Sequence, residues 1–127
     1  MPTTTIDTNV KKLAEVSEKI MNEKAWMISN NFDSGIIEHI ENAFENLNQA
    51  RVIWPNEKAV DGIQISVEML SGIGRYLNNR FTAEKSNKEV QEHIAELFNS
   101  ASDLAHIIGA DAAAENLAWV ADCIREP

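Results

Sequence analysis

Hydrophobic side chains recur along most of the chain at intervals of three and four residues. That spacing places them on one side of an α-helix, and it dominates over any other period. The pattern predicts an all-α protein, an antiparallel up-down bundle of four long helices plus a shorter C-terminal fifth helix. We expect residues 1–127 to form a single helical-bundle domain, frayed at 1–6 and 126–127.

Turn and capping residues predict where the first three helices begin and end. Asp7 or Thr8 can cap the first helix, and Asp33 or Ser34 can cap the second. Pro55 cannot continue a helix interior, so a break is expected there, and Asn56 can cap the third helix. The predicted helices run from just after Asp7 or Thr8 to about Ser29, from about Gly35 to Trp54, and from about Glu57 to Phe81.

A capping box and a glycine mark the last two helices. The run from Ser86 to Glu89 fits a capping box, in which the serine hydroxyl accepts from one free amide and the glutamate reaches back to another. Gly109 stands where a left-handed residue ends a helix. A fourth helix is therefore predicted between Ser86 and Gly109, and Asp111 can cap a fifth of about four turns.

The third predicted helix carries apolar residues on two opposed sides. At about 100° per residue, one stripe faces the expected core. It consists of Ile63, Val67, Leu70, Gly74, Leu77 and Phe81. A second stripe of Ile65, Met69, Gly72 and Tyr76 falls on the opposite side. Either the fifth helix or another neighbour covers this second stripe, or it is offered to another molecule.

Two tryptophans raise the same alternatives. Trp26 and Trp119 project away from the apolar stripes of their helices, whereas Trp54 faces inward. An indole is seldom left in solvent, so either further helices cover these two rings or they anchor a partner. On the first helix, Leu13, Ile20 and Met27 belong to the apolar stripe and Glu23 is expected on the polar side.

Charge and cysteine content narrow the possible partners and setting. The net charge is −9, and residues 87–127 carry eight acids against only Lys88 and Arg125. Because lysine and arginine supply most of the affinity for nucleic acid, we expect no direct binding to nucleic acid and no membrane binding. The single cysteine, Cys123, forms no intramolecular disulfide and suits a cytoplasmic location.

Acidic side chains line two predicted helix faces. The residues are Glu38, Glu41 and Glu45 on the second helix, and Glu89, Glu92, Glu96 and Asp103 on the fourth. Such faces are typical of solvated surfaces. The alternative is nucleic-acid mimicry, in which ordered carboxylates imitate phosphates and block a DNA- or RNA-binding protein.

Motifs for catalysis, metals and cofactors do not assemble in this sequence. Asp103 and His106 provide only part of the donor set that a di-iron bundle requires. His106 also lacks the following lysine and glycine of histidine phosphotransfer domains. Cys123 has no neighbouring base and is expected to be a buried or half-buried inert thiol. We therefore expect no catalytic residue, no metal and no cofactor.

The remaining hypothesis is a small acidic non-enzymatic protein that acts by binding another protein, as an inhibitor, adaptor or accessory factor in a bacterial or phage cytoplasm. The predicted partner-binding residues are Ile65, Met69, Gly72, Tyr76, Trp26 and Trp119. The apolar surface of the third helix also predicts a homodimer through that helix. Nucleic-acid mimicry and a histidine phosphotransfer-like carrier are the alternatives.

Overall fold

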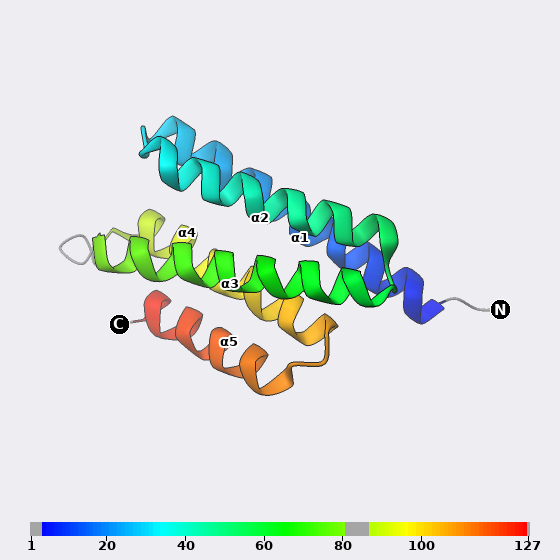
Figure 1. Cartoon of the computed structure of the whole chain (residues 1–127). Helices are drawn as coiled ribbons and strands as arrows, with labels where there is room; N and C mark the ends of the chain where they lie inside the picture. The colour runs from blue at the N-terminus through cyan, green and yellow to red at the C-terminus, as the bar shows by residue number, and fades with distance from the viewer. Residues whose placement is uncertain (1–3, 81–86, 127) are drawn as a thin grey trace.

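The computed structural model describes residues 4–80 and 87–126, with side chains described from Thr8 onward. Five helices and no strand occur within these residues, which confirms the all-α class (Figure 1). The helices are α1 (Thr4–Ser29), α2 (Ser34–Ile53), α3 (Glu57–Arg80), α4 (Lys88–Ile107) and α5 (Asp111–Arg125).

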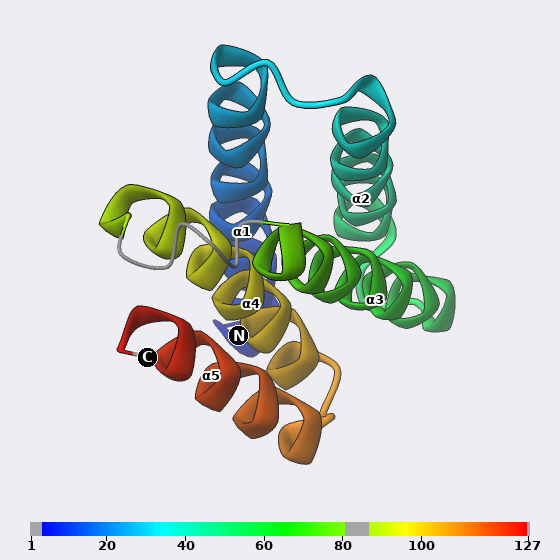
Figure 2. The same cartoon turned by 90° about the vertical axis from the view of Figure 1, so that its left-hand side faces the viewer.

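The four long helices contact one another in a ring. α1 packs against α2, α2 against α3, α3 against α4, and α4 closes the ring on α1. α5 packs against α4, outside this ring (Figures 1 and 2). The contacts agree with a helical bundle that carries one additional helix, while the up-down order of the long helices stays a prediction.

α4 is the helix with the widest buried surface, because it contacts α1, α3 and α5. Its buried residues span about 220° of the helix circumference at 100° per residue. Many of them are small or polar. They are Gln91, Ile94, Ala95, Leu97, Phe98, Ser100, Ala101, Leu104 and Ala105. The helix in the middle of the fold is therefore α4, not α3.

α3 and α4 meet in a tight contact between Gly74 and Phe98. A Cβ atom at position 74 would lie 2.6 Å from the Phe98 ring, far inside van der Waals contact. The aromatic ring therefore occupies the space that any side chain at this position would need. The predicted core stripe of α3 is buried as far as the described residues extend, through Ile63, Val67, Leu70, Gly74 and Leu77.

Several predicted helix boundaries are confirmed. The Asp33 carboxylate accepts from the Gly35 amide at 3.3 Å and caps α2. α2 ends just before Pro55, and the Asn56 side chain accepts from the Lys58 amide at 2.9 Å at the start of α3. Gly109 has a φ of +80°, the left-handed conformation expected where α4 stops.

Three predicted caps are wrong or fall elsewhere. α1 begins at Thr4, so neither Asp7 nor Thr8 starts it. Asn87 caps α4, because its side chain accepts from the Glu89 and Val90 amides. The residue before α5 is Ala110, which has no side chain for capping. Ser86, predicted as the cap of the fourth helix, and Phe81 lie outside the described residues.

Candidate functional site: the α2–α3 groove

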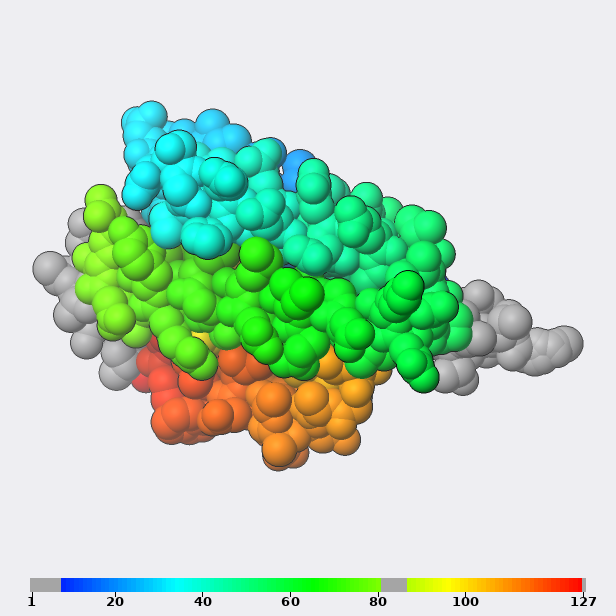
Figure 3. Space-filling model, viewed as in Figure 1, coloured from blue at the N-terminus to red at the C-terminus, as the bar shows by residue number. Residues whose placement is uncertain are grey.

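The second apolar stripe of α3 is exposed. Ile65 and Tyr76 keep 44% and 43% of their surface accessible, and Met69 is half-buried. Nothing lies within 4 Å of the position that a Cβ on Gly72 would occupy. α3 forms a band across the face seen in Figure 3, with α2 above it and α5 below. The alternative in which α5 covers this stripe is wrong, because the stripe is exposed and α5 packs against α4.

A groove of about 390 Å³ follows this stripe, and we call it the α2–α3 groove. α2 supplies one wall through Ile36 and His39, which sequence reasoning did not assign to the site. α3 supplies the rest. The lining residues are Ile36, His39, Ile65, Glu68, Met69, Gly72, Ile73 and Tyr76. The groove thus combines flexible and aromatic apolar side chains with few polar groups, the composition that favours a protein contact.

A smaller depression of about 250 Å³ adjoins the groove near the end of α1 and the start of α4. Ile36 and Tyr76 line both hollows, so the two are neighbours on the surface. Trp26 and Phe32 add aromatic surface to the second hollow. Four of the six predicted partner-binding residues therefore lie in the α2–α3 groove, and a fifth, Trp26, lines the neighbouring hollow.

Trp26 is held mainly by packing within the chain. Its ring stacks on the His93 imidazole of α4, with centroids 4.1 Å apart and planes 11° apart. The Phe32 ring contacts the indole edge-on, with ring centroids 4.9 Å apart. The indole Nε1 is buried and has no hydrogen-bond partner in the described part of the chain. α4 thus covers much of this tryptophan, and only part of it is left to line the hollow.

Beside this stack lies a buried polar contact that sequence reasoning missed. Glu23, expected on the polar side of the first helix, is only 6% exposed, and its Oε1 lies 2.8 Å from Nδ1 of His93. Burial raises the pKa of the Glu23 carboxyl, while hydrogen bonding and attraction from His93 oppose this rise. The sequence does indicate that Glu23 is buried, because it falls between Ile20 and Met27 at helical spacing.

Trp119 and Cys123 lie on α5, away from the site assembled on α3. Trp119 is 64% exposed, so no helix covers it. Cys123 is also exposed, and the prediction of a buried or half-buried thiol is wrong. The six predicted partner-binding residues therefore do not form one site, because α5 packs on α4 and carries Trp119 with it.

Most of the predicted acidic face of α4 is paired with cations of the same chain. Arg125 of α5 donates to Glu92 at 2.9 and 2.8 Å and to Glu96 at 2.9 Å. The hydrogen bond from Arg125 lowers the pKa of the Glu92 carboxyl. Lys12 of α1 lies 3.6 Å from Asp103. These carboxylates hold α5 and α1 against α4, which leaves less negative charge open to solvent.

On α2, Lys24 of α1 pairs with Glu41 at 2.9 Å, while Glu38 and Glu45 are exposed. Glu89 of α4 is also exposed and lines the second hollow. The two predicted acidic faces therefore differ: the face on α2 is largely solvated, whereas the one on α4 is mainly a contact surface.

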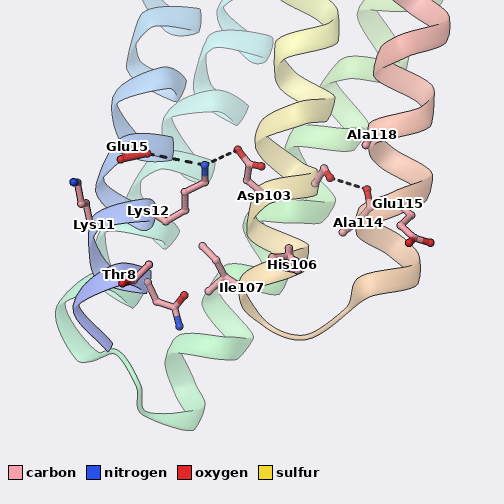
Figure 4. Close-up of a pocket in the computed structure, with 12 residues that line it drawn as sticks. Thr8, Lys11, Lys12, Glu15, Asp103, His106, Ile107, Ala114, Glu115 and Ala118 are labelled. Atoms are coloured by element: carbon pink, nitrogen blue, oxygen red, sulfur yellow. Dashed lines mark hydrogen bonds and ion pairs between the residues drawn. The ribbon is translucent and has the colours of Figure 1, made fainter. Parts of the chain in front are cut away.

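A separate cleft of about 670 Å³ lies between α1, α4 and α5 (Figure 4). Lys12 projects into it between Glu15 and Asp103, and the Ser102 hydroxyl donates to the Ala114 carbonyl at 2.6 Å. His106 lines the same cleft, and its Nδ1 lies 3.1 Å from the exposed Asp111 carboxylate. Partners within the chain thus engage most of its charged groups, in contrast to the apolar α2–α3 groove.

Comparisons with protein-family models, curated proteins and solved structures gave no match. No helix in the described ranges is both long enough and apolar enough to cross a membrane. Among those residues there is also no group of three or more His, Cys, Asp or Glu side chains that could hold a metal ion.

Proposed function

We propose that this protein is a non-enzymatic binding protein whose α2–α3 groove receives an apolar surface of a protein partner. The observation that carries the proposal is the exposure of Ile65 and Tyr76 beside the open space over Gly72. The role is that of an inhibitor, adaptor or accessory factor, rather than an enzyme.

The energetics of the stripe support a partner. Burying a large apolar side chain stabilises by about 1.5–3 kcal/mol relative to full exposure. Ile65 and Tyr76 are each less than half exposed and Met69 is half-buried, so covering each of the three contributes only part of that amount. Together these contributions are still a substantial part of the binding free energy of roughly 8 kcal/mol that a complex with a micromolar Kd requires.

Nucleic-acid mimicry receives less support. It requires rows of carboxylates that face solvent, whereas Glu92, Glu96 and Asp103 are each paired with a cation of the chain. The two hypotheses differ in their response to salt. An apolar groove predicts binding that changes little between low and moderate ionic strength, and a phosphate-like surface predicts binding that collapses.

A photo-crosslinking residue placed at Met69 tests the proposal. The matched control carries the same residue at Glu18, an exposed position of α1. After irradiation in an extract of cells that make the protein, we expect a protein adduct from position 69 and none from position 18. A probe at position 69 that forms no adduct, or adducts of equal yield at both positions, would contradict the proposal.

A further inference from the structure

We infer that the partner in the α2–α3 groove is a second copy of this chain, with the two α3 helices antiparallel and crossing at Gly72. This inference rests on the proposed function, because it names the molecule that fills the same groove. It goes further by fixing the register of the contact, and the register follows from how four side chains are distributed around Gly72.

The first pair of side chains is apolar. Met69 precedes Gly72 by three residues and Tyr76 follows it by four. At 100° per residue, Met69 lies about 60° and Tyr76 about 40° to the same side of Gly72. Both line the α2–α3 groove. Their angles place them on one flank of the helix, on either side of the glycine along its axis.

The second pair is charged and has the matching arrangement on the other flank. Glu68 precedes Gly72 by four residues and Arg75 follows it by three. Glu68 lies about 40° and Arg75 about 60° to the side opposite Met69. Both are exposed. Glu68 accepts from Gln64 of its own helix at 3.1 Å, and the described residues include no ion pair for Arg75.

A twofold axis through an antiparallel pair of helices brings matching flanks together. A residue three positions before the axis then meets one three or four positions after it in the other copy. With a rise of 1.5 Å per residue, the two members of each pair differ by only about 1.5 Å in their distance from Gly72 along the helix axis. They therefore lie at nearly the same height when the two helices run antiparallel. Glu68 thus meets the partner's Arg75, and Met69 meets the partner's Tyr76, each contact occurring twice.

Gly72 supplies the close approach that this crossing needs. The space beside its Cα is open, so the two backbones can approach without a side chain between them. Two chains of charge −9 also repel each other at long range, which makes opposite charges at the contact valuable. The surface of α3 is therefore complementary to itself in shape, apolar content and charge.

A charge-reversal series measured by sedimentation tests the register. The natural chain should be a dimer at micromolar concentration. Glu68→Arg and Arg75→Glu each place like charges opposite each other twice, so each should weaken dimerisation at least about tenfold. The double variant Glu68→Arg with Arg75→Glu restores opposite charges and should recover most of the lost affinity.

The control for Glu68→Arg is Glu45→Arg, which makes the same change in net charge at an exposed residue of α2 and should leave dimerisation within about twofold. Helical circular dichroism of each variant shows that it is folded. A monomeric natural chain, or a double variant weaker than either single one, would overturn the inference.

The photo-crosslinker at Met69 separates this inference from the proposed function. With purified protein alone, we expect an adduct with the mass of two chains. If purified protein gives none while the cell extract gives an adduct with a different protein, the second copy is excluded and the proposed function stands. If neither sample gives an adduct, both fail.

Discussion

The two sides of α3 contain similar residues but have opposite surroundings. Its inward side places Ile63, Leu70 and Leu77 against neighbouring helices with no exposed surface. Its outward side places Ile65 and Tyr76 in contact with solvent. Periodicity identifies both sides as apolar, and only the positions of the other helices separate them. The inward side should therefore govern folding, and the outward side should govern association.

The strongest test of this difference removes a large side chain from each side. Leu70→Ala leaves a cavity among fully buried residues and should lower the free energy of unfolding by about 2–5 kcal/mol. Met69→Ala, one residue away on the outward side, should cost distinctly less. Urea unfolding of dilute protein measures both, and equal losses would contradict the division of α3 into two sides.

The glycine on the inward side should tolerate no side chain. In Gly74→Ala, the added methyl group would overlap the Phe98 ring, so we expect a loss of about 1–3 kcal/mol despite the better helix propensity of alanine. Combining it with Phe98→Leu should cost less than the sum of the two changes, because the smaller side chain gives the methyl group room. Additive losses in urea unfolding would show that the two positions are independent.

A smaller, pH-dependent effect extends the comparison to α1, where Glu23 is the inward acid. Its pKa is raised above the ordinary 4.5 in the folded protein, mainly by burial. Its contribution to stability is therefore complete below pH 4.5 and is lost as the pH rises through the raised value. Glu23→Gln keeps a polar partner for His93 without the buried charge, so it should melt at a higher temperature than the natural chain at pH 7.

That gain in melting temperature should shrink toward pH 4.5. The carboxyl also faces Glu92 and Glu96, whose charges raise its pKa, and His93, which lowers it. The matched control is Glu18→Gln at an exposed site of the same helix, which should show no such trend. Thermal melts followed by circular dichroism at the two pH values provide the measurement. A gain that does not depend on pH would contradict a raised pKa of the Glu23 carboxyl.

The smallest effect on stability belongs to the outward glycine, Gly72, and its sign is opposite to the one expected at Gly74. Gly72→Ala meets no atom within 4 Å and replaces the more flexible residue in a helix, so it should stabilise the monomer by about 0.5–1 kcal/mol. The same methyl group would hold two crossing helices apart and weaken the proposed dimer. Urea unfolding of dilute protein measures the effect on the monomer, and sedimentation measures the effect on the dimer. A destabilised monomer would contradict the predicted difference between Gly72 and Gly74.

The class and number of helices could be predicted because their signals are local. Asp33, Pro55 and Gly109 determine helix ends through their own backbone or the amides next to them. The mispredicted caps of α4 and α5 each lie one position from the observed cap. Asn87 stands beside Ser86, and Asp111 lies one position inside the helix that it was expected to cap.

The central position of α4 could not be predicted in the same way. Part of its buried surface is made of alanine and serine, such as Ala95, Ser100 and Ala105, whose weak hydrophobicity does not stand out in a periodic pattern. The periodic pattern is stronger in α3, whose two apolar stripes predict a central helix more clearly than the alanines and serines of α4 do. Which stripe faces inward depends on how α3 packs against α2 and α4, which is a tertiary property.

For the candidate site, residue spacing placed Ile65, Met69, Gly72 and Tyr76 together on one side of α3, and they line one groove. The opposite wall, from Ile36 and His39, depends on how α2 aligns with α3. The contact between Glu23 and His93 joins residues separated by 70 positions, and periodicity within one helix carries no information about such a pair.

The Gly74–Phe98 contact also bears on how relatives of this chain could be recognised. Position 74 and position 98 share one volume, so neither can change freely while the other stays fixed. A lineage that gains a side chain at position 74 has to lose bulk at position 98, and a glycine there permits a large aromatic residue on the facing helix. In distant relatives whose surface residues have all changed, coordinated exchange at these two positions would outlast overall sequence similarity.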